Sequence, residues 1–280
     1  MIHNVGGDFL KKEMTLIISW IGTDSRKISS FYIASDSRFT WANPLKYDYG
    51  RKVFAFTNSP NILGYCGDVV YPTLILNQIL DMDRDGILFP KDSTNIERSR
   101  IIYKELTKKF DTYPSKGVMD DSLEIIHVSR QGETDFLCNV YKWTKSKGWE
   151  IIPKEILGSS DKVIILGTGE SEFYNRYLDY YRGLNGKTSR ALFQCLTHSL
   201  LKMKDLKCGG SPQLVGLYNR FNGKNFGVIY ENKRYYLGKE IEPDEIVNNI
   251  EWRNELFERC DGLTTKILDG AQRQPDELRP

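Results

Sequence analysis

Four short motifs between residues 14 and 68 carry residue types that catalysis uses. Each of the following stands where an apolar segment begins or ends: Thr15, Asp36, Lys52 and Gly67. A hydroxyl, a carboxylate, an ammonium and a glycine backbone N–H can serve as nucleophile, charge partners and oxyanion donor. Singly, each has an ordinary explanation as a turn or edge residue, so the prediction of a site rests on their joint spacing.

The other reactive side chains favour packing. The five cysteines form no CxxC pair and the three histidines lack ligand spacing, so no metal site is predicted. Cys66 and Cys208 have no histidine nearby in the sequence, and buried cysteine most often acts as a small apolar filler. His127 falls in a strand pattern and His198 in a helical one, which indicates structural or surface histidines rather than bases.

The composition is that of an ordinary globular protein. In 280 residues, 39 basic and 37 acidic side chains give a net charge of +2 without a long single-sign block. We therefore expect no nucleic-acid partner and no membrane partner. The apolar runs are well short of the roughly 20 residues that a membrane span needs, and residues 1–13 lack the apolar core of a signal peptide. The sequence predicts a cytoplasmic protein with reduced thiols.

Hairpin-linked strands alternate with paired helices along the chain. The predicted strands are 15–21, 28–35, 52–56, 62–66, 122–129, 135–143, 148–152, 162–166, 214–221, 226–230 and 234–237. The predicted helices are 69–80, 95–110, 170–181 and 189–203. This order favours an α+β fold, a four-layer α-β-β-α sandwich in which helices cover two antiparallel sheets.

Three segments are expected. Residues 1–14 are polar and glycine-containing, which indicates a leader or a misassigned translation start. Residues 15–240 are predicted to form one domain. Residues 241–280 are predicted to be a C-terminal helical extension, with a helix that starts near Pro243.

The segment from Thr15 resembles the N-terminal half of proteasome β-type subunits and of the HslV-type bacterial peptidase, members of the N-terminal-nucleophile (Ntn) hydrolase superfamily. In that family a threonine at the mature N-terminus starts the first strand, Asp-Ser-Arg or Asp-Gly-Gln ends the second, and a lysine opens the third. Here Asp36-Ser-Arg is followed sixteen residues later by Lys52, and Gly64-Tyr-Cys-Gly67 is similar to the family's Gly-Phe-Ala-Gly. The implied fold is the Ntn hydrolase fold.

The later half, to about residue 230, resembles the family more loosely. Gly-Thr168-Gly stands where the family has Gly-Ser-Gly before a helix, and Asp205-Leu-Lys-Cys208-Gly-Gly resembles its Asp-x-x-Ser-Gly-Gly. The resemblance implies that Thr168, Asp205 and Cys208 belong to the site. Met14 stands where self-processing members carry glycine before the nucleophile.

The resemblance also implies roles. A threonine hydroxyl is a weak nucleophile, but at a free N-terminus the α-amine, with a reference pKa of ~7.7 to 8.0, can act as its base. Thr15 would attack, Lys52 would favour the neutral amine, and Asp36 would keep Lys52 charged and oriented. The backbone of Gly67 would donate to the oxyanion, an interaction worth about 2.7 to 4 kcal/mol.

A threonine peptidase is therefore implied, which cleaves a peptide or protein substrate through an acyl-ester and needs no cofactor. Phe39 and Tyr65 stand where the family lines the pocket for the side chain that precedes the scissile bond. The implied partners are further copies of the chain in a homo-oligomeric ring and an ATP-dependent unfoldase.

Two alternatives stay open. One is an Ntn amidase that acts on a small amide. The other is a catalytically silent assembly or sensor subunit, because Thr15 has no free amine if the leader stays attached. If translation starts at Met14, removal of that methionine would expose the Thr15 amine.

Overall fold

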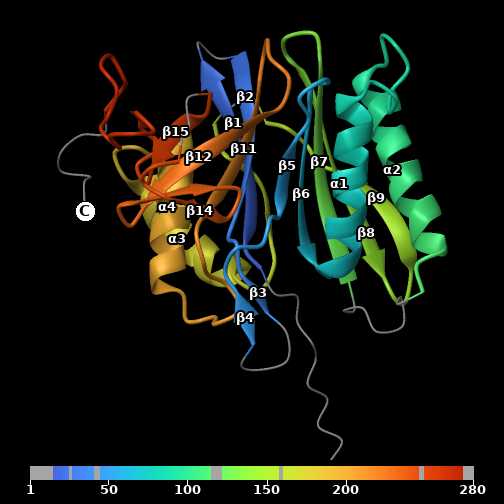
Figure 1. The fold of residues 1–280 in the computed structure, drawn as a ribbon, viewed down its shortest axis with the longest axis horizontal. Coiled ribbons are helices and arrows are strands. Elements are labelled where there is room, and N and C mark those ends of the chain that lie inside the picture. Colours follow the sequence, from blue (N-terminus) through green and yellow to red (C-terminus); the bar gives the residue numbers. More distant parts are fainter. Residues whose placement is uncertain are drawn as a thin grey trace, which may run out of the picture.

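The computed structural model describes residues 15–24, 27–40, 45–114, 122–157, 160–245 and 249–273 (Figure 1). The expected leader, residues 1–14, lies outside the described residues. The strands are β1 (Ile17–Asp24), β2 (Lys27–Ser35), β3 (Phe39–Thr40), β4 (Lys46–Tyr47), β5 (Val53–Ala55), β6 (Asn61–Gly67), β7 (Ser122–Gln131), β8 (Asp135–Thr144), β9 (Gly148–Pro153), β10 (Lys162–Leu166), β11 (Gln213–Tyr218), β12 (Lys224–Tyr230), β13 (Lys233–Tyr236), β14 (Lys239–Ile241), β15 (Glu251–Asn254) and β16 (Arg259–Cys260). The helices are α1 (Val70–Arg84), α2 (Asn95–Asp111), α3 (Glu170–Arg182) and α4 (Ser189–Lys202).

The predicted elements up to residue 237 are confirmed, with ends shifted by a few residues at most. The larger sheet has nine strands in the order β10-β1-β2-β11-β12-β13-β14, with β15 on β12 and β16 on β15. The smaller sheet has five strands, β5-β6-β7-β8-β9, and β3 pairs with β4 in a separate ribbon. The fold is thus mixed α+β with several antiparallel sheets, and the one parallel pair among the described strands is β12 with β15.

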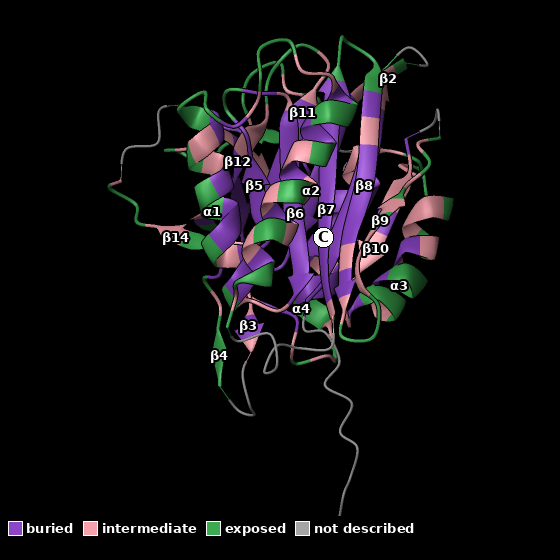
Figure 2. Ribbon diagram, turned by 90° about the vertical axis from the view of Figure 1, so that its right-hand side faces the viewer, coloured by how far each residue is buried: buried purple, intermediate pink, exposed green. Residues whose placement is uncertain are grey.

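The helices cover the sheets in pairs. Figure 1 shows α1 and α2 against the smaller sheet and α3 and α4 against the larger one. Between the two sheets lies an apolar cluster that includes Ile17, Ile33, Val53 and Val215. Figure 2 shows the strands of both sheets as the most deeply buried part of the fold. The sheets therefore meet through side chains, and the site described below lies where both contribute.

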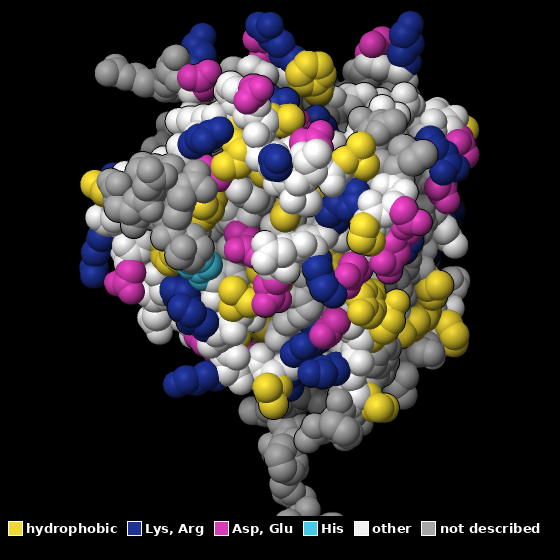
Figure 3. All heavy atoms as spheres, turned by 60° about the vertical axis from the view of Figure 1, so that its left-hand side comes forward, with side chains coloured by type: hydrophobic (Ala, Val, Ile, Leu, Met, Phe, Trp, Pro, Cys, Tyr) yellow, Lys and Arg dark blue, Asp and Glu magenta, His cyan; other side chains and the backbone are white. Residues whose placement is uncertain are grey.

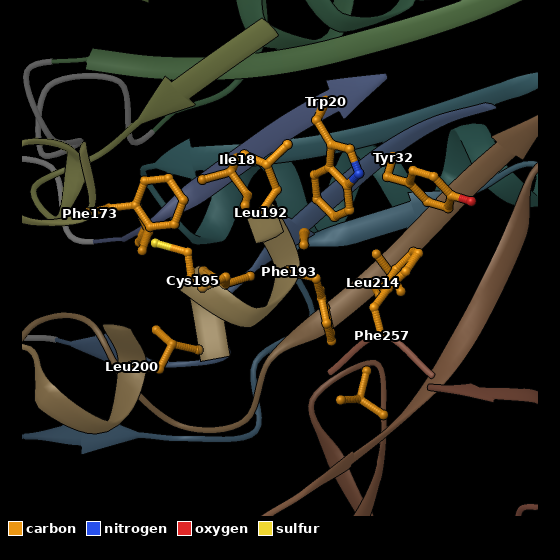
Figure 4. Packing of buried hydrophobic residues seen from close by; sticks show 14 of the residues in the cluster. Ile18, Trp20, Tyr32, Phe173, Leu192, Phe193, Cys195, Leu200, Leu214 and Phe257 are labelled. Carbon is orange, nitrogen blue, oxygen red and sulfur yellow. The ribbon is translucent and has the colours of Figure 1, made fainter. Parts of the chain in front are cut away.

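The core between the larger sheet and its helices is rich in aromatic side chains (Figure 4). Trp20 of β1 stacks on Tyr32 of β2 with ring centroids 5.2 Å apart. Phe193 of α4 and Phe257 pack against this pair, and all four side chains are buried. Aromatic pairs of this kind add about 0.5 to 1.5 kcal/mol each beyond the burial of their area. These aromatic contacts anchor β1, the strand that follows Thr15.

Two helix starts follow from local sequence. Asp68, one residue before the N-cap Val69, accepts a hydrogen bond from the backbone N–H of Tyr71 (3.0 Å), and Pro72 lies in the first turn of α1. In α2, Thr94 and Glu97 form a complete capping box, in which each side chain bonds the other's backbone N–H.

The expected helix in the C-terminal extension is wrong for the described residues. Residues 246–248 lie outside the description, and the chain beyond them forms β15 and β16. Trp252 of β15 is 1% exposed because it packs on Gly227, where a Cβ would lie 2.3 Å from the indole ring. Residues 251–254 pair with β12 instead, a non-local contact that overrides local propensity.

The surface matches the balanced composition. On the face shown in Figure 3, basic and acidic side chains are interspersed, with apolar side chains scattered between them. Within the described parts of the chain, no helix is both long enough and apolar enough to cross a bilayer.

Candidate active site

Thr15 lies directly before β1, and its side chain is 1% exposed. β1 is paired with β2 on one edge and with β10 on the other, so the start of the strand is held from both sides. The carbonyl of Thr15 accepts a hydrogen bond from the backbone N–H of Gly169 at 3.4 Å. Gly167 has a φ of +99°, and a Cβ on it would lie 1.9 Å from the Thr15 carbonyl oxygen. Only glycine lets the loop after β10 close on Thr15.

Asp36 and Lys52 form a buried ion pair beside Thr15. The Lys52 Nζ lies 2.8 Å from Asp36 Oδ1, and the two side chains are 1% and 0% exposed. The same Nζ donates a short hydrogen bond to Thr15 Oγ1. The Asp36 carboxylate also accepts from three backbone N–H groups, those of Leu16 (3.1 Å), Gly209 (3.0 Å) and Arg38 (3.3 Å).

The arrangement of these three side chains is suited to activating the hydroxyl. An isolated buried ion costs several kcal/mol, but here the carboxylate and the ammonium compensate each other. The ammonium is in contact with Thr15 Oγ1. A cation held against a hydroxyl in a water-poor site favours negative charge on its oxygen. The structure therefore brings together the threonine, lysine and aspartate side chains that the sequence predicted as a group.

Thr168, Asp205 and Cys208 also lie together. The Thr168 Oγ1 and the Cys208 Sγ are 3.7 Å apart, and the thiol lies 3.7 Å from Asp205 Oδ2. Burial, followed by the charge of Asp36, raises the pKa of the Cys208 thiol well above its ordinary value. At neutral pH Cys208 is thus a thiol and a poor nucleophile, in keeping with the packing role expected for it.

The residues predicted to line a pocket and the glycine predicted to bind an oxyanion have fewer contacts with Thr15 and Lys52. The Phe39 ring centroid lies 5.6 Å from the Lys52 Nζ, so Phe39 covers the ion pair. Tyr65 is 1% exposed, its hydroxyl donates to the Arg51 carbonyl at 3.2 Å, and its backbone N–H donates to the Lys52 carbonyl at 3.1 Å. Gly67 has a φ of +98°, and a Cβ on it would lie 2.5 Å from the Ser122 carbonyl oxygen. Phe39 and Tyr65 thus lie next to Lys52, whereas no described contact joins Gly67 to Thr15.

Sequence reasoning missed two supporting groups. Arg38 forms a two-pronged pair with Asp48 (2.7 and 2.9 Å), and it also donates to the carbonyls of Leu206 and Cys208. This hydrogen bonding raises the pKa of Arg38 and lowers that of Asp48. The other group is the amide of Gln213, which bonds the backbone on both sides of the ion pair. A polar residue at the start of an otherwise apolar strand was the available signal for Gln213.

Other candidates lie elsewhere, as expected. The Cys66 thiol lies 3.9 Å from Glu124 Oε2, within the cluster between the sheets. His127 and His198 each bond a tyrosine hydroxyl away from Thr15. Among the described residues, no group of three or more His, Cys, Asp or Glu side chains is arranged to hold a metal ion.

No protein-family profile matches the chain, and no curated protein matches it in sequence. Solved structures do resemble it. HslV from Trypanosoma brucei aligns with a TM-score of 0.47 at 11% identity, covering 72% of this chain and 99% of that one. A BPH from Thiobacillus denitrificans, solved in complex with epoxomicin, aligns at 0.46 and 10%, covering 72% and 98%. Anbu from Pseudomonas aeruginosa, solved in a helical assembly, aligns with a TM-score of 0.53 at 15% identity, covering 82% of this chain and 88% of that one.

The likeness to Anbu shows the fold. The identities of all three structures are too low to assign this chain to a sequence family. The chemistry of the site has to be argued from its own residues.

Proposed function

We propose that this protein is a proteasome-like threonine peptidase of the N-terminal-nucleophile type. In this proposal residues 15–240 form the four-layer α-β-β-α domain and residues 241–280 an extension to it. The observation that carries the proposal is the buried chain of contacts from Asp36 through Lys52 to the hydroxyl of Thr15. A lysine with only a structural role has no need to touch a hydroxyl at the start of a strand.

The proposed reaction begins with attack of Thr15 Oγ1 on the carbonyl carbon of a peptide bond. The hydroxyl proton passes to the α-amine of Thr15, which is the general base once the residues before Thr15 have been removed. Lys52 stabilises negative charge on Thr15 Oγ1. The Gly67 N–H donates a hydrogen bond to the oxyanion that forms from the carbonyl oxygen of the substrate. The protonated amine gives its proton to the leaving nitrogen, and water then releases the acyl group from Thr15 by the same steps in reverse.

The remaining site residues have supporting roles in this proposal. Thr168, Asp205 and Cys208 are proposed to flank the amine of Thr15. The hydrogen bond from Gly169, next to Thr168, to the Thr15 carbonyl supports this, as do the contacts of the Cys208 thiol with Thr168 and Asp205. Phe39 and Tyr65 narrow the pocket for the side chain that precedes the cleaved bond. The reaction as proposed needs no cofactor.

A closed homo-oligomeric assembly, in which the sites face a chamber, is part of the proposal. Helices α1 and α2 supply a candidate contact surface, since Val70, Leu74 and Ile96 on them are at least half exposed. Anbu forms a helical assembly, which supports assembly as a property of this fold. An ATP-dependent unfoldase is the partner that a closed chamber would require.

The test uses a peptide epoxyketone, whose two-bond adduct needs a hydroxyl and a free amine on one residue. Intact mass first establishes whether the mature chain begins at Thr15. Peptide mass spectrometry is then expected to find the adduct on Thr15 and none in Thr15→Ala. An adduct on a cysteine, or one that persists in Thr15→Ala, contradicts the assignment. A chain that begins at Thr15 and forms no adduct supports the silent-subunit alternative instead.

A further inference from the structure

Gln213 opens β11 and is fully buried, and its amide forms three hydrogen bonds with the backbone around the ion pair. The Nε2 donates to the carbonyl of Asp36 (3.1 Å) and to the carbonyl of Gly50 (2.7 Å). The Oε1 accepts from the backbone N–H of Lys52 at 3.1 Å. The two carbonyls and the one N–H fix the orientation of the amide, because only the NH2 group can face both carbonyls.

These contacts join the two sheets at the site. Asp36 follows β2 of the larger sheet, in which β2 pairs with β11, whereas Lys52 comes directly before β5 of the smaller sheet. The ammonium of a lysine sits at the end of a flexible four-carbon stem, so its position depends on where the backbone of residue 52 is held. Gln213 bonds that backbone and the backbone of Asp36 with one rigid planar group.

We infer that Gln213 is a positioning residue, which sets the distance between the Lys52 ammonium and the Asp36 carboxylate across the interface of the two sheets. It touches neither side chain and acts through the main chain of both. It also holds Gly50, on which the ring of Phe39 rests, since a Cβ on Gly50 would lie 2.4 Å from that ring. The expected effect of Gln213 on turnover rests on the proposed function, whereas its expected effect on the distance between Lys52 and Asp36 does not.

The alternative is that Gln213 merely satisfies buried backbone groups. The chain offers a matched control for that role in Asn139, a buried amide that donates to Ser99 Oγ at 2.8 Å in the smaller sheet. Gln213→Met and Asn139→Leu each replace an amide by an apolar side chain of similar size. Both are expected to lower the melting temperature, because both leave buried polar partners unsatisfied.

The two variants should differ in turnover and in geometry. Gln213→Met is expected to lower kcat/KM by about 10- to 100-fold, mostly in kcat, because small displacements of catalytic groups cost that much. Asn139→Leu should stay within about twofold of wild type below its melting temperature. In a crystal structure of Gln213→Met, the Lys52 Nζ to Asp36 Oδ1 separation should exceed ~3.5 Å, beyond hydrogen-bonding range.

A Gln213→Met protein that keeps the ion pair at its 2.8 Å separation overturns the inference. If the wild-type protein itself has no peptidase activity, the proposed function fails. The distance between the Lys52 Nζ and the Asp36 Oδ1 in Gln213→Met still tests whether Gln213 positions the ion pair. Should Gln213→Met not fold, Gln213→Glu provides the measurement. Its ionised carboxyl cannot donate to the carbonyls of Asp36 and Gly50, so the separation between the Lys52 Nζ and the Asp36 Oδ1 should again lengthen in its crystal structure. An unchanged separation in Gln213→Glu contradicts the inference.

Discussion

Two buried polar clusters in this protein look alike in their hydrogen bonding and differ in charge and position. The lysine cluster comprises Thr15, Asp36, Lys52 and Gln213. The histidine cluster lies beneath α2 and comprises Asn61, Ser99, His127, Asn139 and Tyr141. In the latter, the His127 Nδ1 lies 2.8 Å from the Tyr141 hydroxyl and its Nε2 lies 3.0 Å from Asn61 Oδ1. The Tyr141 hydroxyl in turn lies 2.8 Å from Ser99 Oγ.

The histidine cluster is neutral and belongs to the smaller sheet and its helix. Burial, with a smaller contribution from Arg98, lowers the pKa of His127 to about 3, so the imidazole is uncharged at neutral pH. Ser99 and Asn139 also line a cavity of about 660 Å³ between α2, β8 and β9. Within the described part of the chain, the Ser99 hydroxyl bonds the Tyr141 hydroxyl and the Asn139 amide, which are both uncharged. The lysine cluster, in contrast, carries two full charges, spans both sheets and ends on a hydroxyl. Buried hydrogen bonds between neutral groups indicate stability, whereas a charged pair held against a hydroxyl is the arrangement on which the proposed activity rests.

Among the substitutions predicted below, Lys52→Ala should have the largest effect on turnover, and so distinguish the lysine cluster most clearly from the histidine cluster. We expect kcat/KM to fall by ~10³-fold, within the usual range for losing a group that assists proton transfer. The substitution leaves the Asp36 carboxylate buried without its cation, so unfolding in urea should show a loss of about 3 kcal/mol. This dependence of stability on Lys52 follows from the burial of the ion pair, which is a property of the tertiary fold.

The double variant Asp36→Asn with Lys52→Ala is the control for that prediction. It removes both charges, so it should regain most of the stability while remaining inactive. Asp36→Asn alone should retain more activity than Lys52→Ala, since its amide oxygen can still accept from Lys52. A folded Lys52→Ala protein with wild-type turnover would remove lysine from the mechanism.

Gly167→Ala should have the next largest effect on the lysine cluster. The new methyl group would meet the Thr15 carbonyl at 1.9 Å, and displacement of Thr15 is expected to lower kcat/KM by ~10²-fold. Gly148→Ala is the matched control, because Gly148 also has a positive φ (+72°) but has nothing within 4 Å of the added methyl. Both variants pay about 1 to 2 kcal/mol for the left-handed backbone, and only Gly167→Ala should lose turnover. Equal rates in the two variants would count against a catalytic Thr15.

His127→Gln should affect stability alone, and in a pH-dependent way. The pKa of His127 is about 3 when folded and about 6.5 when unfolded, so the unfolded state binds more protons between those values. Stability is therefore full above pH 6.5 and falls as the pH drops towards 3. From pH 7 to pH 5 the wild type should lose about 2 kcal/mol more than His127→Gln in urea unfolding. Turnover at pH 7.5 should be unchanged; a tenfold loss there would connect the two clusters.

Most of the fold could be predicted from the sequence, because hydrophobic periodicity and turn residues are local signals. The hairpin β1–β2 and the capped start of α2 are examples. β15 could not be predicted, since Trp252 is placed by its pairing with Gly227 of β12 and not by its neighbours in the chain. A strand of four residues leaves too little periodicity to be told from a helix.

The part of the candidate site that could be predicted is the part marked by the spacing of its residues in the sequence. Asp36 and Lys52 lie at strand ends whose separation matches a known pattern, and the structure places them in contact. Gln213 and the pair of Arg38 with Asp48 were not predictable, because each acts on main-chain groups that only the tertiary fold brings near. Their residue types are common, and their roles depend on nearby backbone carbonyls, with which these side chains form hydrogen bonds.

The hydrogen bonds to Asp36 span long stretches of chain, and this sets an order of events during synthesis. Asp36 is bonded by Gly209 and Gln213, which lie 173 and 177 positions further along. A nascent chain emerging from the ribosome carries Thr15, Asp36 and Lys52 early but lacks the residues that hold them in place until three quarters of the protein has been made. Whatever chemistry Thr15 performs therefore begins only after both sheets have been synthesised and docked.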